Sequence, residues 1–134
     1  MEATMHPFRK AVEARDQDAI EALLADDVVF TSPVAFSPYP GKPVTAAILR
    51  AVMRVFQDFR YVREIGGPDE ENHVLVFTAR VGEREIHGCD ILHVDENGLV
   101  DDLTVMVRPL SAAKALSEAM AAQFEQITRE ATGA

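Results

Sequence analysis

Apolar residues recur at steps of three and four in four stretches of the chain, which is the spacing of one face of an α-helix. Asp16 and Ser111 each precede such a stretch, and their side chains are good N-caps because they accept hydrogen bonds from the first turn. The helices are predicted over residues 8–15, from Asp16 to the Asp26-Asp27 pair, from about Thr45, and from Ser111 to about residue 129, with residues 130–134 fraying.

Elsewhere the apolar spacing is two, which is the period of a β-strand. Residues 32–43 hold four of the seven prolines and predict a stiff loop, because proline fixes φ and donates no hydrogen bond. Helices, then a run of strands, then a helix form an α+β order. We expect a cone-shaped barrel: three N-terminal helices on a strongly bent antiparallel sheet, plus a C-terminal helix. Strands are predicted from Val28, over 59–65 and 73–81, from about Glu85 to Val94, and over 99–108.

The composition narrows the classes of function. A chain of 134 residues is expected to form a single domain, residues 1–134, with a core over about residues 6–128. Its formal net charge of -9 repels phosphate backbones and anionic lipids, which argues against nucleic-acid and membrane partners. No apolar run is long enough to span a bilayer, the first ten residues lack the order of a signal peptide, and there is one cysteine. We expect a cytoplasmic protein without a cofactor.

Asp90 is the main candidate for chemistry. In the alternation of its strand it shares a face with Ile86, Leu92 and Val94, so the pattern places a carboxyl group among apolar side chains. Burying a carboxyl group is costly unless it is protonated, paired or hydrogen-bonded. Asp90 is therefore predicted to be either a structural anchor or the chemical centre of a cavity.

The opposite face of the same strand carries His87, Cys89 and His93. Alternate side chains on a strand are about 7 Å apart, so two histidines six residues apart cannot share one metal ion. Cys89 lacks a visible activating partner. We predict no metal site here.

A long helix over a bent sheet leaves a space that suits a small ligand. The residues at inward positions of the helices and strands are predicted to form the wall of this space. The proline-rich loop could close the mouth of the space or simply pack against the rest of the fold. The register of Tyr61 does not decide whether this side chain reaches Asp90 or faces outward. Residues predicted to bind a ligand are Phe8, Phe30, Ser32, Phe36, Tyr39, Val52, Phe56, Ile86, Leu92, Leu103 and Val105.

From Phe8 to Met120 the chain resembles the nuclear-transport-factor-2-like superfamily, and within it the SnoaL-like and ketosteroid-isomerase-like proteins. The resemblance implies the cone-shaped α+β fold, but this scaffold hosts many functions. It also implies a homodimer formed through the outer sheet face, which carries His87, Cys89, Thr104 and Met106. The residues that carry the resemblance are Ala25-Asp-Asp-Val-Val-Phe-Thr-Ser-Pro33, Gly41 followed by Ile48, Gly88-x-Asp90, Asn97-Gly98 and Arg108-Pro109.

Ketosteroid isomerases use an aspartate base together with a tyrosine and a protonated aspartic acid. On that pattern Asp90 takes the place of the protonated acid, whereas Ser32 replaces the base and Phe8 the tyrosine. Steroid isomerase activity is therefore not expected, because a hydroxyl group is no base near neutral pH. Epoxide-hydrolase-like relatives would need an inward carboxylate near Val105, which the inward pattern of that strand lacks. SnoaL-like cyclases use an acid in the pocket, a part that Asp90 could play.

The lead hypothesis is a cavity that binds a small, mostly apolar molecule whose polar group meets Asp90. Asp90 would act as an acid in an isomerase-, cyclase- or hydrolase-type step, kept protonated near neutral pH by its apolar surroundings. The alternative is a non-catalytic ligand carrier or dimeric interaction module whose cavity is filled by its own side chains. A hollow with Asp90 unpartnered at its base favours the first. A cavity plugged by Phe and Met, with Asp90 bonded internally, favours the second.

Overall fold

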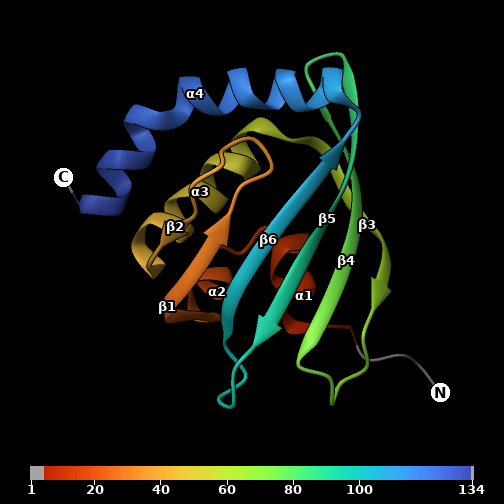
Figure 1. The fold of residues 1–134 in the computed structure, drawn as a ribbon, viewed down its shortest axis with the longest axis vertical. Coiled ribbons are helices and arrows are strands. Elements are labelled where there is room, and N and C mark those ends of the chain that lie inside the picture. Colours follow the sequence, from red (N-terminus) through yellow and green to blue (C-terminus); the bar gives the residue numbers. More distant parts are fainter. Residues whose placement is uncertain (1–4, 134) are drawn as a thin grey trace.

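The computed structural model describes residues 5–133, which form one α+β unit (Figure 1). Three helices lie in the first half of the chain and a fourth lies at its C-terminal end, as predicted. In Figure 1 the first three helices lie behind the sheet, and the last runs across one end of the molecule. The helices are α1 (Pro7–Glu13), α2 (Gln17–Ala22), α3 (Lys42–Val55) and α4 (Leu110–Thr132). The strands are β1 (Leu24–Thr31), β2 (Tyr39–Pro40), β3 (Gln57–Ile65), β4 (Asn72–Val81), β5 (Arg84–Val94) and β6 (Val100–Arg108).

The six strands form one curled sheet in the order β2-β1-β6-β5-β4-β3. From β6 to β3 each strand is antiparallel to its neighbour, as predicted. β1 is instead parallel to β6, so the sheet is mixed and the purely antiparallel prediction is wrong at this one pairing. A parallel neighbour requires a long crossover connection, and the chain from α3 to β5 supplies it. β2 and β3 remain as edges, so the predicted barrel stays open.

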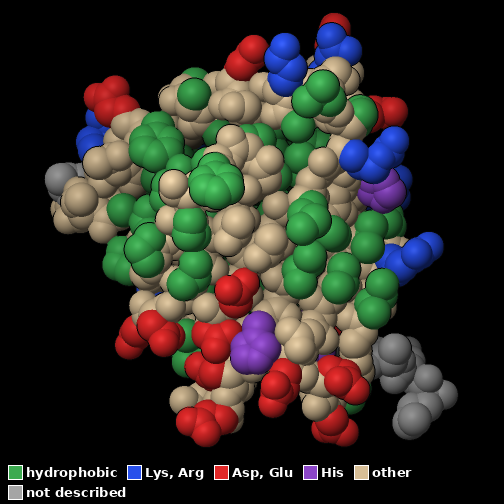
Figure 2. Space-filling model, viewed as in Figure 1, with side chains coloured by type: hydrophobic (Ala, Val, Ile, Leu, Met, Phe, Trp, Pro, Cys, Tyr) green, Lys and Arg blue, Asp and Glu red, His purple; other side chains and the backbone are tan. Residues whose placement is uncertain are grey.

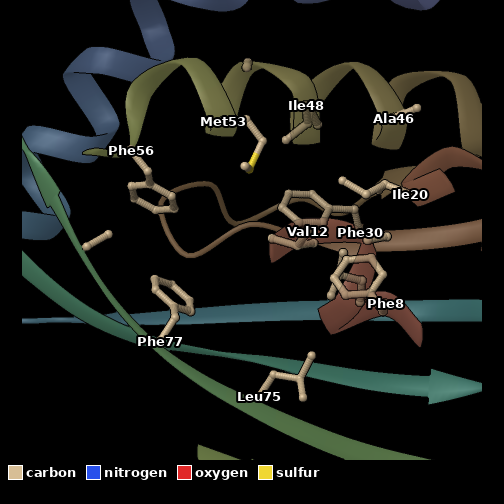
Figure 3. Close-up of a cluster of buried hydrophobic side chains, with 14 of the residues drawn as sticks. Phe8, Val12, Ile20, Phe30, Ala46, Ile48, Met53, Phe56, Leu75 and Phe77 are labelled. Carbon is tan, nitrogen blue, oxygen red and sulfur yellow. The ribbon is translucent and has the colours of Figure 1, made fainter. Parts of the chain in front are cut away.

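The inner face of the sheet, which faces α3, carries the core (Figure 3). The predicted alternation in β4 is confirmed, because Leu75 and Phe77 are both almost fully buried. Leu92 of β5 and Leu103 of β6 continue the same buried layer. Each such side chain stabilises the fold by roughly 1.5–3 kcal/mol when it leaves water. The core therefore lies between the sheet and the helices.

Two predicted boundaries near the N-terminus are wrong. Asp26-Asp27 lies inside β1 and does not end α2, which already stops at Ala22. The strand already begins at Leu24, which pairs with Val100, two residues before the aspartates. Pairing with β6 therefore outweighs the local preference of aspartate for turns. The proline-rich loop also contains a short edge strand, β2.

The start and end of α4 also differ from the prediction. Pro109 occupies the N-cap position without a side-chain hydrogen bond, so Ser111 lies inside the helix and does not cap it. The helix continues through Thr132, past the predicted fray, and Ala134 lies outside the described residues. None of the helices in residues 5–133 is both long and apolar enough to cross a membrane.

Gly88 of β5 lets the core approach the strand that carries Asp90. A Cβ atom at Gly88 would lie 2.6 Å from the Phe77 ring and 2.5 Å from the carbonyl oxygen of Met106. Such distances are far inside van der Waals contact, so only glycine fits at this position. The Phe77 ring can therefore lie over the β5 backbone two residues before Asp90.

Candidate functional site

A cavity lies between the helices and the inner face of the sheet. Its volume is about 60 Å³, counted as the space open to the centre of a water-sized sphere. Figure 3 shows side chains of its wall, with Phe56 after α3 and Phe77 of β4 directed toward each other at a ring separation of 5.6 Å. The lining residues are Phe8, Val12, Ile20, Phe30, Ser32, Pro33, Val34, Ile48, Leu49, Val52, Met53, Phe56, Phe59, Tyr61, Phe77, Asp90, Val105, Leu116 and Met120.

Asp90 and Tyr61 form a buried pair in the cavity wall. The Tyr61 hydroxyl donates a hydrogen bond to Asp90 Oδ2 over 2.6 Å, and the two residues are only 5% and 8% exposed. In residues 5–133, Asp90 Oδ1 accepts no hydrogen bond from a side chain or the backbone. One carboxylate oxygen is therefore bound to the phenol, and the other remains available to a ligand.

The pair spans two strand spacings, because β4 lies between β3 and β5. Two spacings amount to about 10 Å, which only a long side chain can cross. Tyr61 is opposite Phe77, which is itself opposite Gly88. The Phe59 ring holds the Tyr61 ring edge-on, with 5.0 Å between ring centres. The small residue on β5 and the aromatic support together allow the phenol to reach Asp90.

Burial raises the pKa of Asp90 from 3.8 to about 6, and the hydrogen bond from Tyr61 opposes that rise. Burial, followed by the charge of Asp90, raises the pKa of Tyr61 well above its ordinary value, so the phenol keeps its proton. At pH 7 most Asp90 side chains are therefore ionised. The prediction of a raised pKa agrees with the structure, and the hydrogen bond from Tyr61, which stabilises the charged form, limits the rise.

Six of the predicted ligand-binding residues line the cavity together with Asp90. Together with Asp90 they come from five segments of the chain, at or next to α1, β1, α3, β5 and β6, and the fold brings them together around one hollow. Their contact with a ligand remains a prediction. These residues are Phe8, Phe30, Ser32, Val52, Phe56 and Val105.

The other five predicted residues do not line the cavity. Phe36 is 99% exposed at the surface of the proline-rich loop. Tyr39 is half-buried and packs against Phe30 and Phe124, so it holds the loop down. Three further residues point to the inner side of the sheet, as predicted, but belong to the solid core beside the hollow: Ile86, Leu92 and Leu103.

Several lining residues were missed, and for most of them a signal exists in the sequence. Met53 and Ile48 lie on the apolar face of α3, and Leu116 and Met120 lie on that of α4. Their helical spacing predicts that these side chains point into the fold. It does not predict which of them pack in the solid core and which line the cavity. Tyr61 is different, because its direction depends on pairing with β4.

On the outer face, His93 Nδ1 lies 2.6 Å from Asp101 Oδ1, and His93 Nε2 lies 3.6 Å from Glu71 Oε2. The hydrogen bond to Asp101 raises the pKa of His93. Burial raises the pKa of Cys89, which disfavours the nucleophilic thiolate. Among residues 5–133, no cluster of three or more His, Cys, Asp or Glu side chains is placed to hold a metal ion.

Comparison with protein families gives a match to the SnoaL-like domain over residues 6–103. Since that match covers most of the chain, the protein belongs to the SnoaL-like domain family. Its fold is the nuclear-transport-factor-2-like, ketosteroid-isomerase-like fold that the sequence resemblance predicted. None of the curated proteins compared with the chain matches it.

Two similar solved structures are more than a third identical to this chain over the aligned residues. One is described as a steroid delta-isomerase from Pseudomonas aeruginosa, with 42% identity over 89% of this chain and 87% of that one, and a TM-score of 0.83. The other is an uncharacterised bacterial protein with a cystatin-like fold from Silicibacter pomeroyi, with 36% identity over 93% and 90%, and a TM-score of 0.86. An LEH-like epoxide hydrolase of M. tuberculosis, 23% identical over 90% and 91% with a TM-score of 0.59, shares the fold.

Proposed function

We propose that the cavity binds a small, mostly apolar molecule and that one polar group of this molecule meets Asp90. The observation that carries the proposal is the composition of the wall. Among the described lining residues Asp90 is the one carboxyl group, and Ser32 and Tyr61 are the other polar side chains. A hollow with apolar walls and a few convergent polar groups is typical of a small-molecule site.

The same site could transfer a proton. A carboxyl group whose pKa lies near the working pH gives and takes protons efficiently, and the pKa of Asp90 is about 6. An isomerase-, cyclase- or hydrolase-type step would use that property. The description of the Pseudomonas aeruginosa structure as a steroid delta-isomerase supports the isomerase option. Ser32 and Phe8, which stand where ketosteroid isomerases have their base and tyrosine, argue against a steroid as the substrate.

A second candidate is a non-catalytic carrier or interaction module. Two observations favour it: Asp90 already has a partner in Tyr61, and flexible methionines, Met53 and Met120, narrow the hollow. The partner is itself part of the wall, however, and leaves Oδ1 unused. Ligand binding therefore stays the better-supported function.

Asp90→Asn is expected to weaken ligand binding about tenfold or more while the fold stays intact. The asparagine oxygen can still accept the Tyr61 hydrogen bond, but the negative charge is lost, and hydrogen bonds to charged groups contribute about 1.5–3 kcal/mol. The measurement is mass spectrometry of small molecules retained by the purified wild-type and variant proteins, with circular dichroism to check folding. If neither protein retains a molecule, and the substitution changes only thermal stability, the second candidate is favoured.

We also propose that the outer face of the sheet packs against a second copy of the chain. Val76, Cys89 and Met106 form its apolar middle, on three paired strands. Asp102 and His93 lie at one end of this face, and Arg108 lies at the other. Figure 2 views this face and shows acidic side chains gathered at one end and basic ones near the other. A two-fold axis across the strands would set each acidic end against the basic end of the partner.

Met106→Glu should convert this dimer to a monomer. Met106 is 57% exposed in the centre of the apolar middle, so a two-fold interface would bury two glutamates together without partners. The measurement is light scattering after size exclusion. Ile65→Glu, a similar change at a residue 51% exposed on edge strand β3, is the matched control and should leave the mass unchanged. A wild-type protein that is monomeric at tens of micromolar would contradict the proposal.

A further inference from the structure

The polar atoms in the cavity differ in what they can offer a ligand. The phenol of Tyr61 has a single proton, and that proton is used in the hydrogen bond to Asp90 Oδ2. The 2.6 Å distance is typical of a charge-assisted bond from a hydroxyl group to a carboxylate. The pair therefore offers a ligand only acceptor atoms: the phenol oxygen and Asp90 Oδ1.

This pattern distinguishes between ligand groups. A carbonyl or ether oxygen next to Asp90 would place its lone pairs against a carboxylate oxygen, in a wall too apolar to screen the repulsion. A hydroxyl group would instead donate to Oδ1. The pKa of Asp90, about 6, keeps the acceptor form in the majority at pH 7. Ser32 Oγ accepts a hydrogen bond from the backbone N–H of Val34 and keeps its own proton free. The preference for a donor therefore applies to the ligand group that lies next to Asp90.

The size of the hollow limits the ligand as well. The cavity has about 60 Å³, which corresponds to roughly four to six waters at about 10–15 Å³ each, whereas an engineered cavity of about 150 Å³ binds benzene. A single ring therefore already requires the lining side chains to move slightly. Phe56, Phe59 and Phe77 form one side of the cavity and suit a flat ring. A fused ring system would require a much larger movement of these side chains.

We propose that the cavity takes a single-ring, mostly apolar molecule that carries a hydroxyl group, and that this hydroxyl donates to Asp90 Oδ1. Phenols and cyclic alcohols are the matching chemical class. The inference rests on the proposed binding function and adds the class of ligand to it. Because the two claims differ, the experiment must separate the existence of a binding cavity from its preference for a donor.

The experiment is titration calorimetry of the purified wild-type protein at pH 7.5 with phenol, toluene and benzaldehyde. These probes share one ring and differ in offering a hydroxyl donor, no polar group, or a carbonyl acceptor. Phenol should bind at least tenfold more tightly than benzaldehyde and toluene. Lowering the pH to 5 should reduce this preference severalfold, because protonated Asp90 then donates instead of accepting.

Two variants sharpen the result. Asp90→Asn should reduce the preference for phenol over benzaldehyde to less than about threefold. Asp69→Asn is the matched control, since it makes the same chemical change at an exposed residue between β3 and β4 and should keep the preference. If Asp90→Asn does not fold, the pH dependence of the wild-type protein supplies the same comparison.

The outcomes separate the two claims. Equal or tighter binding of benzaldehyde would overturn the hydroxyl class while leaving the binding cavity in place. Binding of toluene as tight as that of phenol would likewise show an apolar cavity without a donor preference. Failure of all three probes to bind would overturn both this inference and the proposed function.

Discussion

Acidification from pH 7 to pH 4 is expected to stabilise the wild-type protein, relative to the Asp90→Asn variant, by about 2 kcal/mol. The pKa of Asp90 rises from 3.8 to about 6 on folding, so the folded state binds the proton more tightly than the unfolded state. This contribution to stability is fully present below pH 3.8 and is lost as the pH rises through about 6. At about 1.4 kcal/mol per pH unit, the difference between 6 and 3.8 corresponds to about 3 kcal/mol in total.

The measurement is urea unfolding of both proteins at a series of pH values. Asparagine does not titrate, so the difference between the two free energies of unfolding isolates Asp90 from the other carboxyl groups. An Asp69→Asn variant retains Asp90 and should therefore retain the gain. A difference between wild type and Asp90→Asn that stays constant from pH 7 to pH 4 would mean that the Asp90 carboxylate is well solvated in the native protein. The binding proposal would then lose its basis.

Phe77→Ala should lower the free energy of unfolding by about 3–5 kcal/mol, the largest effect expected of one substitution here. Phe77 is 1% exposed and lies 4.9 Å from the Phe59 ring and 5.6 Å from the Phe56 ring, centre to centre. Removing it deletes buried apolar surface and leaves a void beside Gly88 that the rigid sheet cannot fill. Since Phe77 also lines the cavity, the void should enlarge it and admit a larger apolar ligand.

Thermal and urea unfolding measure this loss, and Phe124→Ala is the matched control. Phe124 is 46% exposed on α4, so its truncation should cost less than about 1 kcal/mol. A loss at Phe77 no larger than that at Phe124 would show that the aromatic wall is loosely packed. In that case the cavity volume would not limit the size of the ligand.

The position of Asp90 could be predicted from the sequence because β5 is regular. Its pairing with β4 runs without a register shift from Val81↔Arg84 to Asn72↔His93. Alternation therefore holds along the strand, and Asp90 falls on the buried face with Ile86 and Leu92. The apolar faces of α3 and α4 could be predicted equally well, because the spacing of apolar residues in a helix depends only on residues close together in the chain.

The partner of Asp90 could not be predicted in the same way. Tyr61 lies on β3, where the register with β4 shifts between Gln57 and Arg60 and again between Tyr61 and Arg63. In this irregular part of β3, Val62 and Ile65 are exposed although both are apolar. The alternation of apolar and polar residues therefore no longer predicts which face of the sheet a side chain points to. No local pattern in the chain marks these irregularities.

The proline-rich loop shows a similar limit. Its composition predicts stiffness, but stiffness does not tell which side chain turns inward. Phe36 faces solvent, and Tyr39 packs against Phe124 of α4, a residue more than eighty positions later in the chain. The sequence left open whether these two aromatic residues close the mouth of the cavity or pack the loop down, and neither of them lines the cavity.

The sequence alone determined the α+β fold, the family resemblance, the face on which Asp90 lies and most of the apolar wall, because these depend on local periodicity and on ordered motifs. Only the tertiary structure decided that Tyr61 reaches Asp90, that the cavity is about 60 Å³, and that β1 is parallel to β6. Those features depend on distances across several strands, where small shifts in register and curvature add up. The proposed charge of Asp90 and the proposed size of the ligand both depend on that geometry.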